Sequence, residues 1–437
     1  MSRRIAVVSA VNPFPADAGK KVVLAGLLEY FVERHGPASI HYIHVGDTRD
    51  TGVAAPESRG PAAGARSPAW PTTVCAVPPP RSSDAVRQVL TRTSTGRSSL
   101  QEALLRSPRT EEGIRREVER VRPDTIVYDT VRMAQYAEHS GAAQQICYLD
   151  DLFSERYATM LRTARLHPDI DIAPLGNFAG FVPGPLRPLA GHRLGWQSLL
   201  EAERRLIRRA EDRVARDLDR ALLISEPEAD LLRTRTGLAE NRIMSIPPLL
   251  RAPAGCPRRP SARPEYVFLG LLSLPHNDDG LRSFLASVWP LVLAGEPRAR
   301  LRIIGRSPRP GLREAAATHA DSVTFEGFVP DLAEALATAT AMVNHLRFGS
   351  GIKLKVIEAL GHALPVVSTG IGAHGIDNSN SSGLRTADTP ADFAAHLMDL
   401  ADPAVNAVHS AAAGAHFARA YSRDAVMGRY DHAFREP

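Results

Sequence analysis

Short apolar stretches rich in β-branched residues alternate along the chain with stretches in which apolar residues recur every three or four positions. Residues 4–11 (RIAVVSAV) predict a buried strand, and residues 22–35 predict a helix that ends at Gly36. Further strands are expected over 38–46, 125–129 and 145–151. This alternation is typical of a doubly wound parallel α/β sheet, in which functional residues gather at the carboxyl ends of the strands.

The same order of elements repeats after a proline-rich segment, residues 248–264, that lacks apolar periodicity and indicates a linker. Strands are then predicted over 266–270, 299–305, 322–327 and 341–345, with helices between them. We therefore expect two Rossmann-like domains facing across a cleft, where small ligands commonly bind. The expected bounds are 1–247 for the N-terminal domain, 265–415 for the C-terminal domain, and 416–437 for a helix that packs back on the N-terminal domain.

Two segments, 46–81 and 167–195, are rich in proline and small residues and are expected to be irregular. Long loops of this kind serve either as lids and acceptor-binding elements or as variable surface, and both readings stay open. A long amphipathic helix is predicted over 196–221, followed by a strand over 221–226.

Composition and charge narrow the class of protein. At 437 residues the chain exceeds the usual size of one hydrophobic core, which favours two domains. The formal charge of +5 would suit an anionic ligand, but arginine and glutamate are interleaved, so nucleic-acid binding is not favoured. Three separated cysteines suggest no disulfide framework and no zinc site. Without a long apolar run, a cytoplasmic protein is expected; peripheral membrane contact and a homo-oligomer stay open.

The most informative stretch is FGSGIKLKVIEALGHALPVVSTGIGAHG, residues 348–375. Its small residues precede a predicted helix over 353–360, so that a phosphate could approach the backbone amides at the helix start. Lys353 or Lys355 would add positive charge. Glu358, expected about two turns and roughly 10 Å into the helix, could accept hydrogen bonds from a ribose. Alternatively, Glu358 is a surface residue paired with Lys355.

These residues resemble a known family. GSGIKLKVIEALGHALPVVST is similar to the nucleotide-sugar signature of GT-B glycosyltransferases, in particular the retaining family 4, also called glycosyl transferases group 1. NPFPADAGKK resembles the N-terminal loop of that family, and VFLGLLSLPHN with RLRIIGRSP resembles the start of its C-terminal domain. The resemblance implies a nucleotide diphosphate sugar, linked to GDP, UDP or dTDP, as the donor substrate. It also implies retention of the anomeric configuration, no cofactor and no metal.

The resemblance assigns the donor to the C-terminal domain and the acceptor to the N-terminal domain. Glu358 would hold the ribose, Lys353 or Lys355 would balance the leaving group, and residues 370–375 would border the nucleotide. The donor-binding set implied is Gly19, Gly270, His276, Phe348, Gly349, Ser350, Gly351, Lys353, Lys355 and Glu358. This chain departs from the family at Ser350, where a glutamate is usual, and lacks the usual basic pair after the first C-terminal strand. His276 and Arg306 are the nearest replacements.

The acceptor side is expected at the ends of strands 125–129 and 145–151. The residues expected to take part in catalysis are Asp150, Asp151, Lys355 and Arg306, and those expected to bind the acceptor are Asp129, Arg132 and Ser154. Capping of the following helices is an alternative role for Asp151 and Asp129. A metal at Asp150 and Asp151 is not favoured, because adjacent residues on an extended strand point apart.

The function expected from the sequence is transfer of a sugar to a hydroxyl or thiol of a small-molecule acceptor, in specialised-metabolite or antibiotic biosynthesis. One alternative is a glycosyltransferase for a cell-envelope polysaccharide or lipid-linked glycan. Another is a catalytically weakened nucleotide-sugar-binding subunit, suggested by Ser350. A sugar-nucleotide epimerase or a phosphorylase is a further enzyme alternative. An NAD oxidoreductase is not favoured, because the first strand runs into NPFPADAG and not into GxGxxG.

Overall fold

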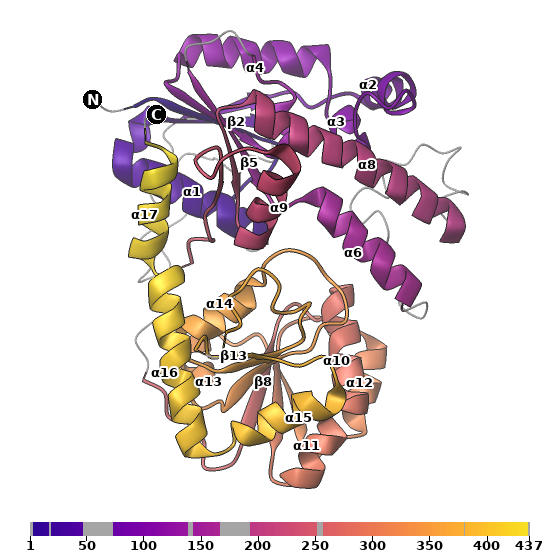
Figure 1. Cartoon of the computed structure of the whole chain (residues 1–437), viewed down its shortest axis with the longest axis vertical. Helices are drawn as coiled ribbons and strands as arrows, with labels where there is room; N and C mark the ends of the chain where they lie inside the picture. Colours follow the sequence, from indigo (N-terminus) through magenta and orange to yellow (C-terminus); the bar gives the residue numbers. More distant parts are fainter. Residues whose placement is uncertain are drawn as a thin grey trace. The chain divides into compact units, whose positions relative to one another are not determined.

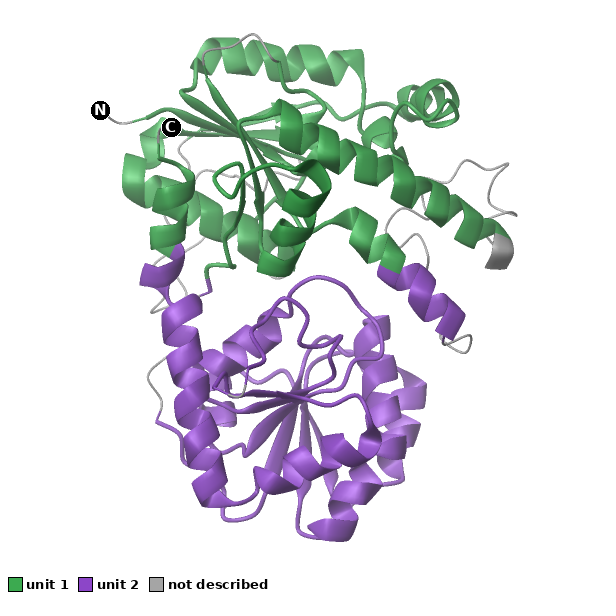
Figure 2. Ribbon diagram, viewed as in Figure 1, with its two compact units in different colours: residues 1–158, 174–249, 427–437 green, residues 159–173, 250–426 purple. Residues whose placement is uncertain are grey.

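The chain folds into two compact units (Figure 2). The computed structural model describes residues 3–16, 19–46, 73–138, 143–166, 193–250, 257–379 and 381–435. Unit 1 comprises residues 1–158, 174–249 and 427–437, and unit 2 comprises residues 159–173 and 250–426. Each unit is built around its own parallel sheet.

Unit 1 contains a seven-stranded sheet in the order β3-β2-β1-β4-β5-β6-β7, and its paired strands all run parallel. The strands are β1 (Ile5–Ser9), β2 (Ile40–Val45), β3 (Thr73–Val77), β4 (Thr125–Asp129), β5 (Gln144–Asp150), β6 (Arg220–Leu223) and β7 (Ile243–Ser245). Every residue of β1 and β4 is buried, as expected for central strands covered by helices on both faces.

Helices cover both faces of this sheet (Figure 1). They are α1 (Gly19–His35), α2 (Ser82–Gln88), α3 (Leu100–Leu104), α4 (Pro108–Val121), α5 (Thr130–Ala134), α8 (Arg193–Asp217) and α9 (Glu226–Thr236), with a short 3₁₀ helix, η1 (Pro37–Ser39), and a π-helical turn, η3 (Val89–Thr93). Helix α6 (Phe153–Leu166) begins in unit 1. The chain order and the sheet order together give the doubly wound arrangement.

Unit 2 repeats the arrangement with six parallel strands in the order β10-β9-β8-β11-β12-β13. The strands are β8 (Glu265–Leu269), β9 (Arg300–Ile304), β10 (Val323–Gly327), β11 (Ala341–Asn344), β12 (Val366–Ser368) and β13 (Leu384–Thr386). The helices are α10 (Pro275–Ser287), α11 (Trp289–Gly295), α12 (Pro310–Ala317), α13 (Leu332–Ala337), α14 (Leu354–Gly361), α15 (Pro390–Asp399) and α16 (Pro403–Ala420). Their apolar faces enclose a core that includes the fully buried Trp289, Phe284 and Phe393.

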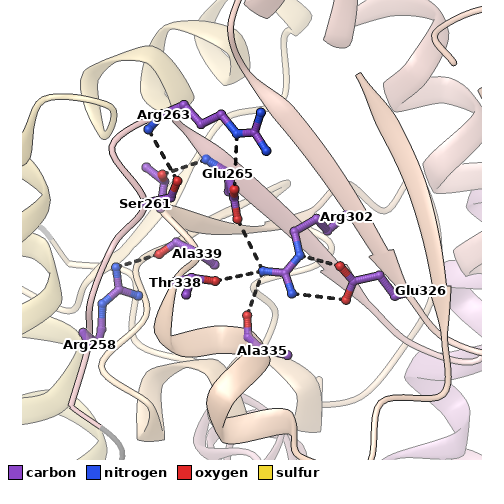
Figure 3. A network of polar contacts seen from close by, with 10 residues as sticks. Arg258, Ser261, Arg263, Glu265, Arg302, Glu326, Ala335, Thr338 and Ala339 are labelled. Carbon is purple, nitrogen blue, oxygen red and sulfur yellow. Dashed lines mark hydrogen bonds and ion pairs between the residues drawn. The ribbon is translucent and has the colours of Figure 1, made fainter. Parts of the chain in front are cut away.

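A polar network ties the sheet of unit 2 to the end of α13 (Figure 3). Arg302 on β9 donates to both carboxylate oxygens of Glu326 on β10, at 2.5 and 3.2 Å. It also donates to the carbonyl oxygen of Ala335 at 2.9 Å and to the hydroxyl of Thr338 at 3.0 Å. Arg302 therefore supplies hydrogen bonds to carbonyl and hydroxyl groups that the last turn of α13 leaves unpaired.

The C-terminal helix, α17 (Arg423–Ala433), contacts α1 in unit 1 through aromatic rings and charge. Tyr430 stacks on Tyr30 with ring centroids 4.9 Å apart, and Phe434 meets Phe31 edge-on at 4.7 Å. The Asp431 carboxylate accepts a hydrogen bond from the Tyr30 hydroxyl at 3.1 Å. Burial is the larger cause of the raised pKa of Tyr30, and the negative charge of Asp431 adds to it. These contacts join the end of the chain to the first helix.

The two doubly wound parallel sheets confirm the predicted α/β fold class. Within segment 46–81, however, the expectation of irregular structure was wrong for Thr73–Val77, which form the edge strand β3 against β2. The sequence analysis also did not find β7 and β13, which have three residues each. The rest of that segment, 47–72, and most of segment 167–195 lie outside the described residues. No helix among the described residues is long and apolar enough to cross a membrane.

Candidate functional site

The sheet order places a binding position in unit 2 between β8 and β11. From β8 the chain continues to β9 and β10 on one side of the sheet. From β11 it continues to β12 and β13 on the other side, so the chain turns in opposite directions after the neighbouring strands β8 and β11. In open α/β sheets the crevice at such a switch point binds ligands at the carboxyl ends of the strands. Gly270 follows β8 there, and Phe348 to Gly351 follow β11.

The loop after β11 is held closed by Lys353. Its ammonium group donates to the carbonyl oxygens of Ser350 and Gly351, at 2.8 and 2.6 Å. Gly349 and Gly351 have φ values of 139° and 66°, which side-chain-bearing residues rarely adopt. Phe348 is buried beneath the loop. The two glycines and Lys353 therefore fix the backbone in front of α14.

The first residue of α14 is Leu354, and Lys353 occupies its N-cap position. Glu358 is thus one turn from the helix start, about 6 Å along the axis, and not the two turns expected from the sequence. The predicted helix began at Lys353, which the structure places in an extended conformation at the N-cap, and the estimate of two turns was too long. The carboxylate consequently lies nearer to the loop than expected.

Lys355 is a largely buried cation on α14. Its Nζ lies 3.1 Å from Oδ1 of Asn277 and 4.1 Å from the ring centroid of Phe268. Burial, followed by repulsion from Lys353, lowers the pKa of Lys355 to about 7. Among the residues that the structure describes, Lys355 has no carboxylate partner. A nearby anion would relieve this electrostatic strain and raise the pKa.

Asn277 positions Lys355 and was missed by the sequence analysis. Its side-chain nitrogen donates to the carbonyl oxygen of Leu271 at 2.9 Å, which turns the amide oxygen toward Lys355. A Cβ at Gly270 would lie 2.8 Å from this nitrogen. Next to Asn277, burial and the two lysines lower the pKa of His276 to about 4, so the imidazole is neutral at physiological pH. A His-Asn dipeptide at a helix start was the only sequence signal for Asn277.

Glu358 and Arg306 are exposed charged residues of unit 2, and neither forms an ion pair with a described residue. Glu358 is exposed on α14 and has no hydrogen-bond or ion-pair partner among the described residues, so the alternative pairing with Lys355 is not observed. Partial loss of solvent around the carboxyl nevertheless raises its pKa. Arg306 follows β9 and stacks on Phe328 at 4.6 Å.

The glycine turn after β12 packs closely against the end of β11. Asn344 donates through Nδ2 to the Ser368 hydroxyl and to the carbonyl oxygen of Gly372, both at 3.0 Å. A Cβ at Gly372 would come within 2.4 Å of the same nitrogen. Residues 370–375 are therefore held beside the loop that carries Gly349 and Gly351.

Unit 1 has a corresponding cluster at its own switch point, between β1 and β4. The Asp129 carboxylate at the end of β4 accepts from the Ser9 hydroxyl at 2.6 Å and pairs with Lys20 at 2.5 Å. Lys20 also lies 3.4 Å from Asp150 at the end of β5. The sequence analysis quoted the GKK stretch but did not select Lys20, since only the fold brings it to the two aspartates.

The backbone and the charges of this cluster are both perturbed. Thr130 and Asp150 have φ values of 65° and 73°, which are uncommon for such residues and often mark functional sites. Burial raises the pKa of Asp150, Asp151 and Asp129 raise it further, and Lys20 opposes them. Burial lowers the pKa of Lys20, but Asp129 and Asp150 outweigh this effect and raise it overall. Asp150 therefore takes up a proton more readily than an aspartate in water.

The adjacent Asp151 turns to a different partner. Its carboxylate accepts from Nε of Arg156 at 3.1 Å and from the terminal nitrogen at 2.5 Å. Close to this pair, burial raises the pKa of Glu228 to about 8, and Asp151 adds to the effect. Glu228 carries a buried carboxylate oxygen that accepts no hydrogen bond from the part of the chain that the structure describes, and it was not selected from the sequence.

The remaining predicted residues of unit 1 divide into open and enclosed positions. Gly19 is exposed as the first residue of α1, directly before Lys20. Arg132 donates to the Thr130 hydroxyl at 3.1 Å and is half-buried. Ser154, in contrast, is fully buried, and its hydroxyl bonds to Glu211 at 2.5 Å. Ser154 therefore joins α6 to α8 and does not face solvent.

Among the described residues, no three or more histidine, cysteine, aspartate or glutamate side chains are grouped so that they could hold a metal ion. The sites at the two switch points thus consist of lysines, carboxylates and glycine-bounded backbone. Such groups recognise anions and hydroxyls.

Comparison with known proteins identifies the class. Residues 263–402 match the profile of the family "Glycosyl transferases group 1". The match is confined to that part of the chain, and the two parallel sheets are those of the GT-B fold. Both findings confirm the resemblance noted from residues 348–375.

Individual relatives are distant. An uncharacterized 44.6 kDa protein in the cps region of Klebsiella pneumoniae is 28% identical over 139 residues, which are 30% of this chain and 36% of that protein. TarM of S. aureus is 12% identical with a TM-score of 0.51, covering 75% of this chain and 58% of TarM. The matches thus span about a third of the curated relative and less than two thirds of TarM.

Two solved structures match over nearly the whole chain. HepE from Anabaena, in complex with UDP, has a TM-score of 0.59 at 11% identity and covers 98% of both chains. WaaG, a glycosyltransferase involved in lipopolysaccharide biosynthesis, has a TM-score of 0.52 at 12% identity and covers 98% of both. HepE has also been solved with UDP-glucose. At these identities the likeness shows the fold.

Proposed function

We propose that the chain is a glycosyltransferase that moves a sugar from a nucleoside diphosphate sugar to a hydroxyl of a cell-envelope glycan. The observation that carries the donor assignment is Lys355, a buried cation with a lowered pKa and no carboxylate partner among the described residues. It lies on the helix that follows the glycine-bounded loop at the switch point of unit 2. A diphosphate is an anion that fits this position.

In the proposed donor complex, the diphosphate lies against the backbone of Ser350 and Gly351. Lys355 gains its positive charge as the diphosphate binds, and Glu358, one turn along α14, accepts hydrogen bonds from the ribose hydroxyls. Arg306 supplies further charge at the side of β9. UDP is the first nucleotide to test, because HepE binds UDP and UDP-glucose.

In the proposed reaction, the bond between the sugar C1 and the diphosphate oxygen breaks, and its electron pair leaves with the nucleoside diphosphate. Lys355 and the amides in front of α14 stabilise the charge that develops on that oxygen. The acceptor hydroxyl forms the new glycosidic bond and gives up its proton to a phosphate oxygen or to a carboxylate. Retention of configuration, as the family resemblance implies, means attack from the face that the diphosphate leaves.

The cluster of Asp129, Asp150 and Lys20 is the proposed acceptor-side group. Asp150 and Asp129 can accept hydrogen bonds from sugar hydroxyls, and the raised pKa of Asp150 suits a group that exchanges a proton. Asp151, held by Arg156, and Arg132 would orient the acceptor from the same strand ends. Ser154 is omitted from this proposal because its hydroxyl is enclosed.

The acceptor class is proposed from the relatives. WaaG is named for lipopolysaccharide biosynthesis, and the Klebsiella relative is encoded in a cps region. The small-molecule, antibiotic-type acceptor expected from the sequence has no support among the matches, so the cell-envelope alternative takes its place. A nucleotide-sugar-binding subunit remains the second candidate, favoured by Ser350 where the family usually has glutamate.

The test is turnover with UDP-glucose, GDP-mannose and dTDP-glucose, offered with lipooligosaccharide, polyprenyl-linked sugar or a panel of small alcohols. We expect one donor to be consumed with a glycan acceptor, and Lys355→Met to reduce kcat about 10²- to 10³-fold. The matched control is Arg298→Met, an exposed cation of unit 2. Donor binding without turnover by any acceptor would favour the binding subunit, and transfer only to small alcohols would refute the acceptor class.

A further inference from the structure

Unit 1 contains a cavity of about 280 Å³ that the proposed reaction does not use. It lies between η3, α3, α5 and the last turns of α8, and α3 and α8 contact each other (Figure 1). Its charged and polar lining consists of Arg92, Arg97, Ser98, Glu102, Arg106, Gln135, Arg213 and Asp217. We call this cavity the arginine pocket.

A turn over residues 92–98 contributes three residues to the lining of the arginine pocket. The carbonyl oxygen of Arg92 accepts from the amides of Arg97 at 2.8 Å and Ser98 at 3.4 Å, which brings the three residues together. This turn directly follows the π-helical turn η3, a type of irregularity frequent at functional sites. Ser98 is 9% exposed, and its hydroxyl has no hydrogen-bond partner among the described residues. A buried hydroxyl in a cavity calls for a partner, which a ligand could supply.

The charges in the arginine pocket are unequally compensated. Glu102 is neutralised, since it pairs with Arg213 and accepts from the amide of Ser99 at 3.0 Å. Arg106 donates to the carbonyl oxygen of Gln135 at 3.1 Å and pairs with Glu111 at 3.5 Å. Neither Arg92 nor Arg97 makes a side-chain hydrogen bond or ion pair with any described residue. With Asp217 in the lining and Glu111 beside Arg106, four arginines are balanced by three carboxylates, an excess of one positive charge.

The arginine pocket is separate from the acceptor-side cluster. Leu218, which contributes to its lining, precedes the amino end of β6 by two residues. Asp129 and Asp150 lie instead at the carboxyl ends of β4 and β5. The pocket is also lined by Ala134 and Gln135 at the end of α5, but neither Asp129 nor Asp150 belongs to its lining.

We propose that the arginine pocket binds a phosphate group of a small phosphorylated molecule. Guanidinium groups match the geometry of phosphate oxygens with paired N–H donors, and Arg92 and Arg97 have theirs available. The Ser98 hydroxyl donates a further hydrogen bond to the same group. The cavity has room for a phosphate together with about one sugar ring or a glycerol unit, which limits the ligand to a small phosphate ester.

The test is titration calorimetry of the full chain with inorganic phosphate and with glycerol 3-phosphate, in the presence of saturating UDP to occupy the donor site. Each phosphate ligand should bind, with glycerol 3-phosphate the tighter. Arg92→Ala and Arg97→Ala should each weaken Kd about tenfold, and Ser98→Ala about threefold. Arg116→Ala, at an exposed arginine of α4, is the matched control and should leave Kd unchanged.

Absence of heat with either ligand up to about 20 mM, or equal binding by the wild type and the Arg92→Ala/Arg97→Ala double variant, would overturn the proposal. Glucuronate tests a carboxylate in place of phosphate, and tighter binding of glucuronate would also overturn it. Because Arg92 and Arg97 lack partners, both variants should keep the wild-type melting temperature, which verifies folding. Glu358→Gln should weaken UDP binding about 10- to 150-fold without affecting the binding of phosphate, so failure of the donor assignment is distinguishable from failure here.

Discussion

The lowered pKa of Lys355 makes nucleotide binding depend on pH in a calculable way. With a pKa of about 7, half of the Lys355 side chains are protonated at pH 7, and only about 3% at pH 8.5. A bound diphosphate raises the pKa of Lys355. UDP therefore binds preferentially to protein in which Lys355 is protonated, and protein in which Lys355 is neutral takes up a proton on binding. The Kd for UDP should therefore weaken about 16-fold between pH 7 and 8.5, which is about 1.6 kcal/mol.

The direction of the pH dependence distinguishes protonation of Lys355 from protonation of the ligand. The second ionisation of a phosphate lies near pH 6, so ionisation of UDP would strengthen binding as pH rises, opposite to the lysine effect. Calorimetry in two buffers of different ionisation enthalpy should give an uptake of about 0.5 proton at pH 7 and about 0.9 at pH 8. Lys355→Met should bind UDP more weakly, with no pH dependence above pH 7.

Lys355→Arg is the charge-preserving control, because arginine stays protonated throughout the range. It should show a flat Kd between pH 7 and 8.5. Wild-type binding without proton uptake, or the same pH slope in Lys355→Met, would refute the reasoning. Removal of the buried charge should also stabilise the protein without ligand by about 1 to 3 kcal/mol, so weaker binding of Lys355→Met cannot reflect unfolding.

Three further variants test the surroundings of the site. Asn277→Ala removes the amide oxygen 3.1 Å from Lys355 and should weaken UDP binding about five- to tenfold in calorimetry; an unchanged Kd would contradict the positioning role. Gly305→Ala would place a Cβ 1.8 Å from the carbonyl oxygen of Gly270 and should lower the free energy of unfolding in urea by more than about 3 kcal/mol. A decrease of less than about 1 kcal/mol would contradict this close packing. Arg302→Ala breaks the network of Figure 3 and should cost about 2 kcal/mol in the same assay, whereas no loss would mean that the network does not stabilise the fold.

Much of the fold could be predicted because its central strands are continuous apolar runs separated by amphipathic helices. The edge strand Thr73–Val77 was missed because it follows a long segment rich in proline and small residues, and all of its residues except Val77 are only half-buried. A half-buried edge strand lacks the continuous apolar signal of strands such as Ile5–Ser9. Strands of three residues are likewise too short to show a period.

The donor site was predictable in composition but not in its contacts. The order of glycines, lysines and Glu358 could be read directly, whereas the helix start at Leu354 depends on the positive φ of Gly351 and the extended conformation of Lys353. Asn277 reaches Lys355 from a different helix, 78 positions away in sequence. Lys20, Asp129 and Asp150 likewise meet only because parallel strands bring their carboxyl ends together. Single residues brought together by the fold leave no local pattern.

The central claim is that Glu358 holds the ribose of a nucleoside diphosphate at the switch point of unit 2. The most direct measurement compares the Kd of UDP with that of its 2′,3′-dideoxy analogue, for the wild type, Glu358→Gln and the exposed control Glu334→Gln. Charge-assisted hydrogen bonds of about 1.5 to 3 kcal/mol predict that the wild type and the control prefer UDP by about 10- to 150-fold. Glu358→Gln should lower this preference to less than about fivefold, and an undiminished preference in Glu358→Gln would contradict the account.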